Sequence, residues 1–342
     1  MITESDLIKI INKKKIIVSN IENLSKEELI AIIEYNNPIW KIYDWITKIN
    51  PYYLCQNKNP ILINYLKQNP NKIDWKGLSS NPNAIELLLC NTDKIFWGGL
   101  SRNTHPLAIK LLERNQDKID WNNLSDNINA IQILEQNQDK INWTWLSANI
   151  NAIPILEKNL DKVDWSWLSG NINAIPILEK NLDKVDWEEL SANPNAIQIL
   201  ENNLDKINWN TLSCNLNAIE LLEKNLDKVD WSILSDNENA IELLKANPNK
   251  IKWKYLSANP NGIELLKTNP KKINWSELSE NPNGIELLKA NPKKIDWNSI
   301  QVNTNPEAIQ ILKNKPEKIV FTDDIYKNIN IFTMDFYKML YC

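Results

Sequence analysis

Hydrophobic and polar positions recur along the chain with a period of 22 residues, and a tryptophan marks each unit. The tryptophans stand at positions 75, 97, 121, 143, 165, 187, 209, 231, 253, 275 and 297. One step measures 24 residues because two residues are inserted near Thr104 and His105, and a second step of 24 reaches Phe321 in the tryptophan's place. This regularity predicts tandem units that stack into one array without a single globular centre.

The unit Asp186–Ile207, with the sequence DWEELSANPNAIQILENNLDKI, shows how each unit is built. Asp186 is a good N-cap for a first helix. Trp187 and Leu190 lie on one face of this helix, which we expect to be about five or six residues long and partly 3₁₀ in character. The residues Ser191–Asn193 then break it.

A second, longer helix follows in the same unit. Pro194 fits its first turn, where a missing amide costs nothing, and Asn193 is its cap. An apolar stripe at helical spacing runs along it through Ala196, Ile197, Ile199 and Leu200. We expect this helix to span about ten residues. It should end at Asn203, because asparagine tolerates the left-handed conformation just after a helix end.

Two short helices cannot bury their apolar faces alone, so neighbouring units must stack to form a continuous core. The predicted fold is therefore all-α. It is an α-solenoid of about eleven to twelve 22-residue repeats, each with one short and one longer helix. We place the tryptophans in this core, where each would bury about 150–250 Å².

The two ends of the chain depart from the repeat. We interpret residues 1–58 as an N-terminal helical cap with a capping box at Ser25–Glu28, the alternative being an independent functional domain. Residues 59–321 form the predicted solenoid. Residues 322–342 end in an apolar, aromatic tail, which we interpret as a C-terminal cap or, alternatively, as a partner-binding tail.

The units LSANPNAIQILENN and LSENPNGIELLKANPKKIDW resemble those of uncharacterised tandem-repeat proteins encoded by giant DNA viruses that infect amoebae. The abundance of Asn, Lys and Ile is typical of AT-rich coding DNA and agrees with this origin. The resemblance covers about residues 60–321 and implies an all-helical solenoid of viral origin. It implies no catalytic residues.

Cysteine use and the N-terminal stretch indicate the cellular setting. The 342-residue chain has a net charge of -4 and four scattered cysteines without metal-ligand spacing, which predicts reduced thiols in a cytoplasmic protein. The viral resemblance would place it in the infected host cell or in the virion. A secretion signal and a run of about 20 apolar residues are both lacking, so we expect neither secretion nor a membrane partner.

Candidate catalytic residues do not stand out from the repeat. The single histidine, His105, lies in an inserted segment, while serines and carboxylates recur with the unit instead of marking one site. GxGxxG, GxxxxGK and HExxH motifs are absent. We therefore predict a protein that is not an enzyme and that needs no cofactor or metal. Helix caps and asparagine ladders between stacked units explain the repeated asparagines, such as Asn193.

Positions that differ between units are better candidates for function, because the scaffold does not dictate them. The position two residues after each tryptophan holds Trp145 and Trp167 in neighbouring units, and Ile233 and Tyr255 in two others. We expect each pair to lie one above the other as exposed interface residues. The alternative is that these side chains pack down onto neighbouring helices.

Charge also changes along the array. One position of the second helix holds glutamate up to Glu223 and then lysine, at Lys245, Lys267 and Lys289. Residues 121–244 carry 20 acidic residues and 8 lysines, a balance of -12, whereas residues 245–296 carry 5 and 10, a balance of +5. A solvated face, docking of a charged partner and association between copies of the chain all fit this pattern.

We predict from these patterns a non-enzymatic protein-interaction scaffold or a structural spacer, with another protein as its partner. The alternative is nucleic-acid binding through the lysine-rich C-terminal repeats, since lysines suit phosphates. Arginines for base edges are scarce there, and the acidic middle of the array opposes a long polyanion.

Overall fold

The computed structural model describes residues 8, 50–58, 60–315 and 318. Every regular element in these ranges is helical, which confirms the predicted all-α solenoid. Contacts divide the chain into two units, Met1–Asn50 with Thr333–Cys342, and Pro51–Phe332. The second unit holds the repeat array. Most of the predicted N-terminal cap and all of the predicted C-terminal cap lie outside the described residues.

Most repeats open with a short helix that begins at the tryptophan; we call these the Trp-led helices. They are α6 (Trp75–Ser79), α8 (Trp97–Arg102), α10 (Trp121–Ser125), α12 (Trp143–Ala148), α14 (Trp165–Gly170), α16 (Trp187–Ala192), α18 (Trp209–Leu212), α20 (Trp231–Asp236), α22 (Trp253–Ala258) and α24 (Trp275–Glu280). In most of them the preceding Asp or Asn caps the helix as predicted. Asp186, for example, accepts hydrogen bonds from the amides of Glu188 (3.0 Å) and Glu189 (3.2 Å).

The second helix of each repeat is shorter than predicted. These helices are α7 (Ile85–Leu89), α9 (Pro106–Glu113), α11 (Ile131–Gln136), α13 (Ile153–Leu156), α15 (Ile175–Leu178), α17 (Ile197–Glu201), α19 (Ile219–Glu223), α21 (Ile241–Ala246), α23 (Ile263–Thr268), α25 (Ile285–Ala290) and α26 (Pro306–Lys313). In the unit Asp186–Ile207 the residues before α17 form a tight turn instead of helix, closed by a hydrogen bond from the Ala196 amide to the Asn193 carbonyl. In this set, α9 and α26, which follow the two-residue insertions, start directly at a proline and run for eight residues.

Short 3₁₀ segments fill the remaining parts of several repeats. Before the second helix stand η4 (Pro82–Ala84), η8 (Glu238–Ala240), η9 (Pro260–Gly262) and η11 (Pro282–Gly284). After it stand η3 (Pro70–Lys72), η5 (Thr92–Lys94), η6 (Gln116–Lys118), η7 (Gln138–Lys140), η10 (Pro270–Lys272) and η12 (Pro292–Lys294). Bonds of the 3₁₀ type suit runs of three or four residues, which is all the room that a 22-residue repeat leaves.

The second helix ends without the left-handed residue that we predicted. Asn137 and Asn247, which correspond to Asn203, have φ angles of -133° and -126°. The side chain caps the helix end instead: the Asn203 Nδ2 donates a 2.8 Å hydrogen bond to the Ile199 carbonyl. Because the amide group satisfies a carbonyl that the helix end leaves free, the backbone needs no left-handed turn.

Aliphatic side chains, not tryptophans, form the centre of the core. Leu190 and Leu200 are fully buried, as are their counterparts in most other repeats. The tryptophans that head the repeats are only partly buried, so their predicted place in the core is wrong. In eight repeats of the described array a lysine ammonium lies 4.4–5.1 Å from the tryptophan ring centroid. The tryptophan therefore packs at the core's edge, with one face available to a cation.

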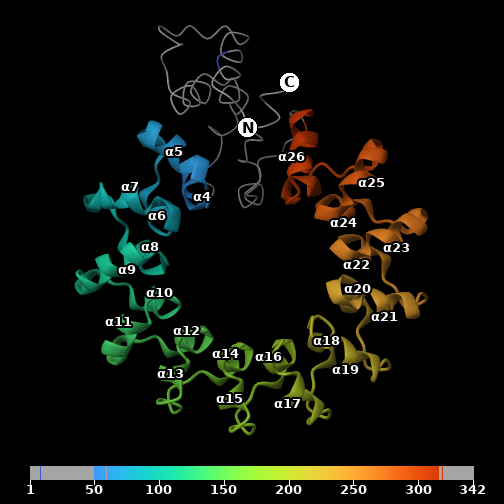
Figure 1. The fold of residues 1–342 in the computed structure, drawn as a ribbon, viewed down its shortest axis with the longest axis horizontal. Coiled ribbons are helices and arrows are strands. Elements are labelled where there is room, and N and C mark those ends of the chain that lie inside the picture. Colours follow the sequence, from blue (N-terminus) through green and yellow to red (C-terminus); the bar gives the residue numbers. More distant parts are fainter. Residues whose placement is uncertain (1–7, 9–49, 59, 316–317, 319–342) are drawn as a thin grey trace. The chain divides into compact units, whose positions relative to one another are not determined.

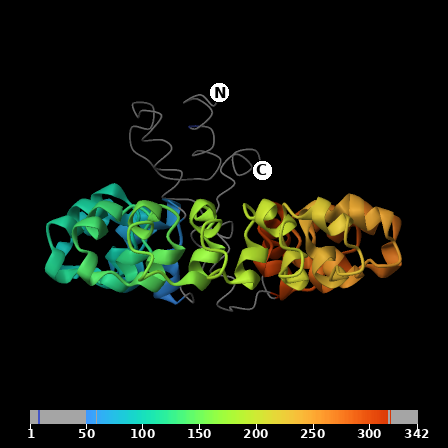
Figure 2. The same ribbon diagram turned by 90° about the horizontal axis from the view of Figure 1, so that it is seen from below.

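Stacking of the repeats places the two kinds of helix in two layers. Most consecutive Trp-led helices contact each other directly, whereas the second helices contact mainly the Trp-led helix and the 3₁₀ segments of their own repeat. The Trp-led helices therefore lie closer together, and the row of repeats curves with them on its inner side (Figure 1). Seen from the side, the repeats stand next to one another in a band of even height (Figure 2).

At the start of the array a helix without tryptophan takes the role of a Trp-led helix. This helix, α4 (Pro51–Gln56), packs on α6 and is followed by α5 (Pro60–Gln68). Cys55 stands where the other repeats have serine, and its Sγ accepts a hydrogen bond from the Asp74 amide at 3.2 Å. At the other end, the 3₁₀ segment η13 (Ser299–Val302) replaces the α-helix after Trp297 and packs on α24.

Candidate functional site

The repeated asparagines form a ladder through the array, as predicted. Each buried asparagine six residues after the tryptophan reaches back to the previous repeat. Asn193 Nδ2 donates to the Ser169 carbonyl (3.0 Å) and the Asn171 carbonyl (3.2 Å), while its Oδ1 accepts from the Asn195 amide (3.0 Å). One side chain thus bonds to three backbone groups, two of which, the Ser169 carbonyl and the Asn195 amide, depend on it. Both of its N–H donors are used within the array.

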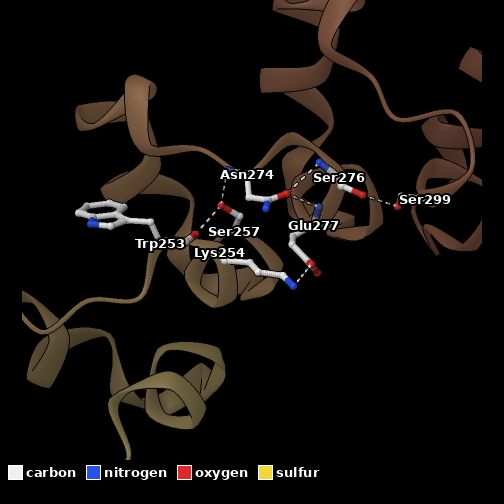
Figure 3. A network of polar contacts seen from close by, with 7 residues as sticks. All are labelled: Trp253, Lys254, Ser257, Asn274, Ser276, Glu277 and Ser299. Carbon is white, nitrogen blue, oxygen red and sulfur yellow. Dashed lines mark hydrogen bonds and ion pairs between the residues drawn. The ribbon is translucent and has the colours of Figure 1, made fainter.

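The repeated serines are used in the same way. Ser257 Oγ donates to the Trp253 carbonyl at 2.7 Å and accepts from the Asn274 amide of the next repeat at 3.0 Å (Figure 3). Asn274 in turn caps α24 through the amides of Ser276 and Glu277. The serine hydroxyl therefore links two repeats and has no base beside it that would make it a nucleophile.

The remaining candidate for chemistry, His105, has a structural role. Its Nδ1 accepts a hydrogen bond from the Leu107 amide at 3.1 Å, so it is the N-cap of α9. Within residues 50–58 and 60–315, no group of three or more His, Cys, Asp or Glu side chains converges on a point where a metal ion would sit. A bilayer-spanning helix, one both long and apolar enough, does not occur in that part of the chain either.

Function is therefore to be sought at the variable positions of the Trp-led helices. Because the leucine three residues after the tryptophan points into the core, the positions one and five residues after the tryptophan lie on the opposite side of the helix. The position two residues after the tryptophan lies beside them, next to the neighbouring Trp-led helix. Most of these side chains are exposed or partly exposed. They face away from the second helices, on the inner side of the curve, and we call them the inner ridge.

Trp145 and Trp167 meet at the middle of the inner ridge. They belong to α12 and α14, and their ring centroids lie 5.6 Å apart with the planes tilted by 44°. Their side chains are 38% and 46% exposed. The prediction that these two residues lie one above the other is confirmed. Each ring packs on the residue of the neighbouring helix and also keeps an exposed part, so their role as interface residues stays a prediction.

The second pair is less open. Tyr255 is exposed, whereas Ile233 is only partly so. The Lys254 ammonium lies 5.9 Å from the Tyr255 ring centroid and also pairs with the Glu277 carboxylate at 3.6 Å (Figure 3). This stretch of the ridge therefore already has an internal partner for its aromatic ring.

Carboxylates also lie on the ridge, next to the tryptophan pair and in α20. Glu188 and Glu189 follow the tryptophan pair in the next repeat, and both are exposed. Further along the chain, burial and then the neighbouring carboxylates of Glu277 and Glu238 raise the pKa of Asp236. The centre of the inner ridge is thus aromatic and negatively charged.

The predicted lysines lie elsewhere. Lys245, Lys267 and Lys289 are on the second helices α21, α23 and α25, in the other layer. Each ammonium pairs with a glutamate three residues earlier in its own helix, at 2.7, 2.7 and 3.0 Å. Hydrogen bonds with Glu307 and Glu286 also raise the pKa of Lys289. The structure therefore does not bring the lysines and the tryptophan pair into one site.

One feature of the ridge was not predicted. Near the start of the array a hollow of about 250 Å³ opens on the ridge. Its lining includes Lys76, Phe96, Gly98, Gly99, Arg102 and Asn123. Phe96 occupies a cap position that most other repeats give to Asp or Asn, and its ring lies so close to the two glycines that a Cβ on Gly98 would be 3.1 Å from Cε1. These departures from the repeat pattern were the signal for the hollow.

Comparisons with protein-family models, with curated proteins and with solved structures gave no match. The resemblance to repeat proteins of giant viruses therefore stays a prediction. The candidate site rests on the geometry of the inner ridge alone.

Proposed function

We propose that this protein is a non-enzymatic protein-interaction scaffold and that the inner ridge is its binding surface, with Trp145 and Trp167 at the centre. The observation that carries the proposal is the exposed, stacked pair itself. Two large aromatic rings lie in contact with each other at positions where the repeat requires no aromatic residue.

Aromatic pairs of this kind suit the centre of a protein interface. Tryptophan is enriched among the residues that contribute most to binding, because a rigid ring buries a large area at a small cost in conformational entropy. Exposed rings also gain most from being covered, since about 25 cal/mol is recovered for each Å² of apolar surface removed from water. A pure spacer needs only the repeated residues and has no use for this pair.

The alternative, nucleic-acid binding through the lysine-rich repeats, has less support. Lys245, Lys267 and Lys289 each lie beside a glutamate, so their positive charge is locally balanced. A salt titration with single-stranded RNA and duplex DNA tests this alternative. We expect no binding at low salt, whereas binding that weakens steeply with salt would favour the nucleic-acid function.

The scaffold proposal is tested by comparing retained proteins for two double variants. Trp145→Ala/Trp167→Ala removes the pair on the ridge, and Leu204→Ala/Leu216→Ala removes two exposed apolar side chains away from it. Proteins retained from an extract by the full chain are identified and each is then measured as a purified partner by calorimetry. We expect the tryptophan variant to lose partners that the leucine variant keeps; equal binding by both variants would contradict the proposal.

A further inference from the structure

We propose that the inner ridge recognises a lysine or arginine side chain in an extended, basic segment of a partner protein. The cationic group would lie against the rings of Trp145 and Trp167, beside the carboxylates of Glu188 and Glu189. This inference rests on the proposed scaffold function and adds the chemistry of the partner to it.

The array itself shows how its tryptophans bind a cation. Lys206 lies 4.9 Å from the Trp187 ring centroid, and Lys228 lies 4.7 Å from that of Trp209. The same contact recurs in six further repeats of the described array. An ammonium is attracted to the negative face of the indole ring, and tryptophan is the strongest of the aromatic residues in this respect.

Trp145 and Trp167 lack such a partner. No lysine or arginine among the described residues lies over either ring, although Tyr255 at the corresponding position has Lys254. The residues directly before them, Thr144 and Ser166, are uncharged. A cation that lies over these two rings would therefore have to come from another molecule.

Small residues keep access to the rings open. The position three residues after each ring, which lies on the same side of the helix, holds Ala148 and Gly170. A Cβ placed on Gly170 would meet a single atom within contact distance, Glu189 Oε2, at 3.5 Å. The carboxylate of Glu189 therefore lies next to the helix that carries Trp167, with no bulky side chain between.

The carboxylates of Glu188 and Glu189 are also available to a cation. Neither Glu188 nor Glu189 forms an ion pair within the described residues, whereas Glu277 at the position of Glu189 pairs with Lys254. The region around them is strongly acidic, with a balance of -12 over residues 121–244. Such a surface attracts a basic segment and orients it before contact. Exposed rings next to unpaired carboxylates form the combination that recognises an organic cation.

Three lysines of the basic repeats in a second copy suit the ridge less well than those of an extended segment. Lys245, Lys267 and Lys289 are each engaged by a glutamate of their own helix, so another copy presents them already partnered. The ridge advances by one Trp-led helix per repeat, which gives an extended chain successive side-chain positions along its length.

The test uses labelled ten-residue peptides of Gly and Ser that carry one central residue of interest and no other charged side chain. The central residue is lysine, trimethyllysine, its uncharged tert-butyl isostere, or glutamate. Binding to the full-length chain is measured by fluorescence anisotropy at several salt concentrations. We expect the isostere, which keeps the shape and loses the charge, to bind about tenfold more weakly than trimethyllysine.

Three variants of the full chain locate the binding. Trp145→Leu/Trp167→Leu keeps apolar area and removes the ring electrostatics, and it should weaken trimethyllysine binding about tenfold. Glu188→Gln/Glu189→Gln should reduce both affinity and salt dependence. Leu204→Ala/Leu216→Ala, which removes two exposed apolar side chains away from the ridge, is the control and should bind as the parent does.

The outcomes separate this inference from the scaffold function. If trimethyllysine and its uncharged isostere bind equally to the parent chain, the proposed recognition of a cation is wrong. This comparison needs no variant. If partner proteins still depend on the tryptophan pair, the scaffold function stands with another ligand class. If the binding of peptides and the binding of partner proteins are both unchanged when the two tryptophans are replaced, both proposals fail. A dimer of the parent chain at low salt that Trp145→Leu/Trp167→Leu abolishes would assign the ridge to a second copy instead.

Discussion

At the scale of single residues, the fold depends on polar side chains that bond to backbone groups of their own and the neighbouring repeat. Asn193 pairs with two carbonyls of the previous repeats and one amide of its own turn. Ser191 repeats the arrangement of Ser257 by donating to the Trp187 carbonyl and accepting from the Asn208 amide. Buried amides and hydroxyls are stable only where every group is paired. The spacing in the sequence was sufficient to predict ladders, since residues of one type at one period must stack.

Replacing a ladder asparagine should therefore cost far more than replacing an exposed one. Asn193→Leu leaves the Ser169 carbonyl and the Asn195 amide unpaired and removes one of the two hydrogen bonds to the Asn171 carbonyl. We expect it to lower the free energy of unfolding by about 3 kcal/mol. Asn195→Leu is the matched control, because its side chain is exposed and gives up one bond to the Ile172 carbonyl; its cost should be about 1 kcal/mol or less. Urea denaturation measures both, and similar costs would show that the ladder adds little stability.

Cys55 provides a pH-dependent test of the first repeat. Burial raises the pKa of this thiol from 9.0 to about 11. The folded state then keeps the proton while the unfolded state loses it, so stability should be constant below pH 9 and fall between pH 9 and about 11, by about 2 kcal/mol. Cys55→Ser restores the residue of the other repeats and should remove this part of the fall. Identical pH profiles of variant and parent would contradict the burial of the thiol.

At the scale of elements, the distance between Trp-led helices depends on the residue that faces the neighbour. A Cβ on Gly77 would collide with the carbonyl oxygen of Tyr52, and would lie 3.2 Å from its Cα, so α4 and α6 approach this closely only because glycine is there. The sequence shows that a glycine stands at this position, but it does not show why a larger residue would not fit. Only the packing of α4, a helix that lacks the tryptophan, shows which backbone it approaches.

Two glycine-to-alanine substitutions should change the stability in opposite directions. Gly77→Ala forces α4 and α6 apart and should destabilise the start of the array by about 1–3 kcal/mol, the usual cost of overpacking. Gly170→Ala meets only an ordinary contact with Glu189 and should be neutral or stabilising by up to about 1 kcal/mol, because alanine favours helix over glycine. Thermal denaturation of both variants measures the difference, and a stable Gly77→Ala protein would show that these helices can separate freely.

At the scale of the whole described array, stability is a sum of local terms. Each repeat contacts its neighbours and no distant repeat has to be in place for it to fold. The buried leucines contribute most of the packing, whereas the tryptophans contribute from the edge of the core, each beside its lysine. A change in one repeat should therefore be felt over a few repeats and no further.

Hydrogen exchange tests both statements with two substitutions in one helix. Leu212→Ala leaves a cavity and should cost about 3 kcal/mol, while Trp209→Ala removes a partly exposed ring and should cost less. Protection should fall in α16, α18 and α20 and remain unchanged in α24. If Trp209→Ala lowers stability more than Leu212→Ala does, the tryptophans belong to the core after all. Loss of protection throughout the array would contradict the local character of its stability.

The sequence by itself determined the repeat, its length, the all-α class, the helix caps and the asparagine ladder. These follow from periodicity and from the bonding capacity of single residues, which are local properties. It also placed Trp145 above Trp167, because equal positions in neighbouring repeats must stack.

Only the tertiary structure decided what depends on the packing of neighbours. It interrupted the second helix with a tight turn, because Asn193 bonds to the repeat before it instead of starting a full helix. It left the tryptophans at the edge of the core, since the aliphatic side chains already fill the space between the layers. It also turned the Trp-led helices to the inner side of the curve, because they pack more closely than the second helices, and this made Trp145 and Trp167 part of one exposed ridge.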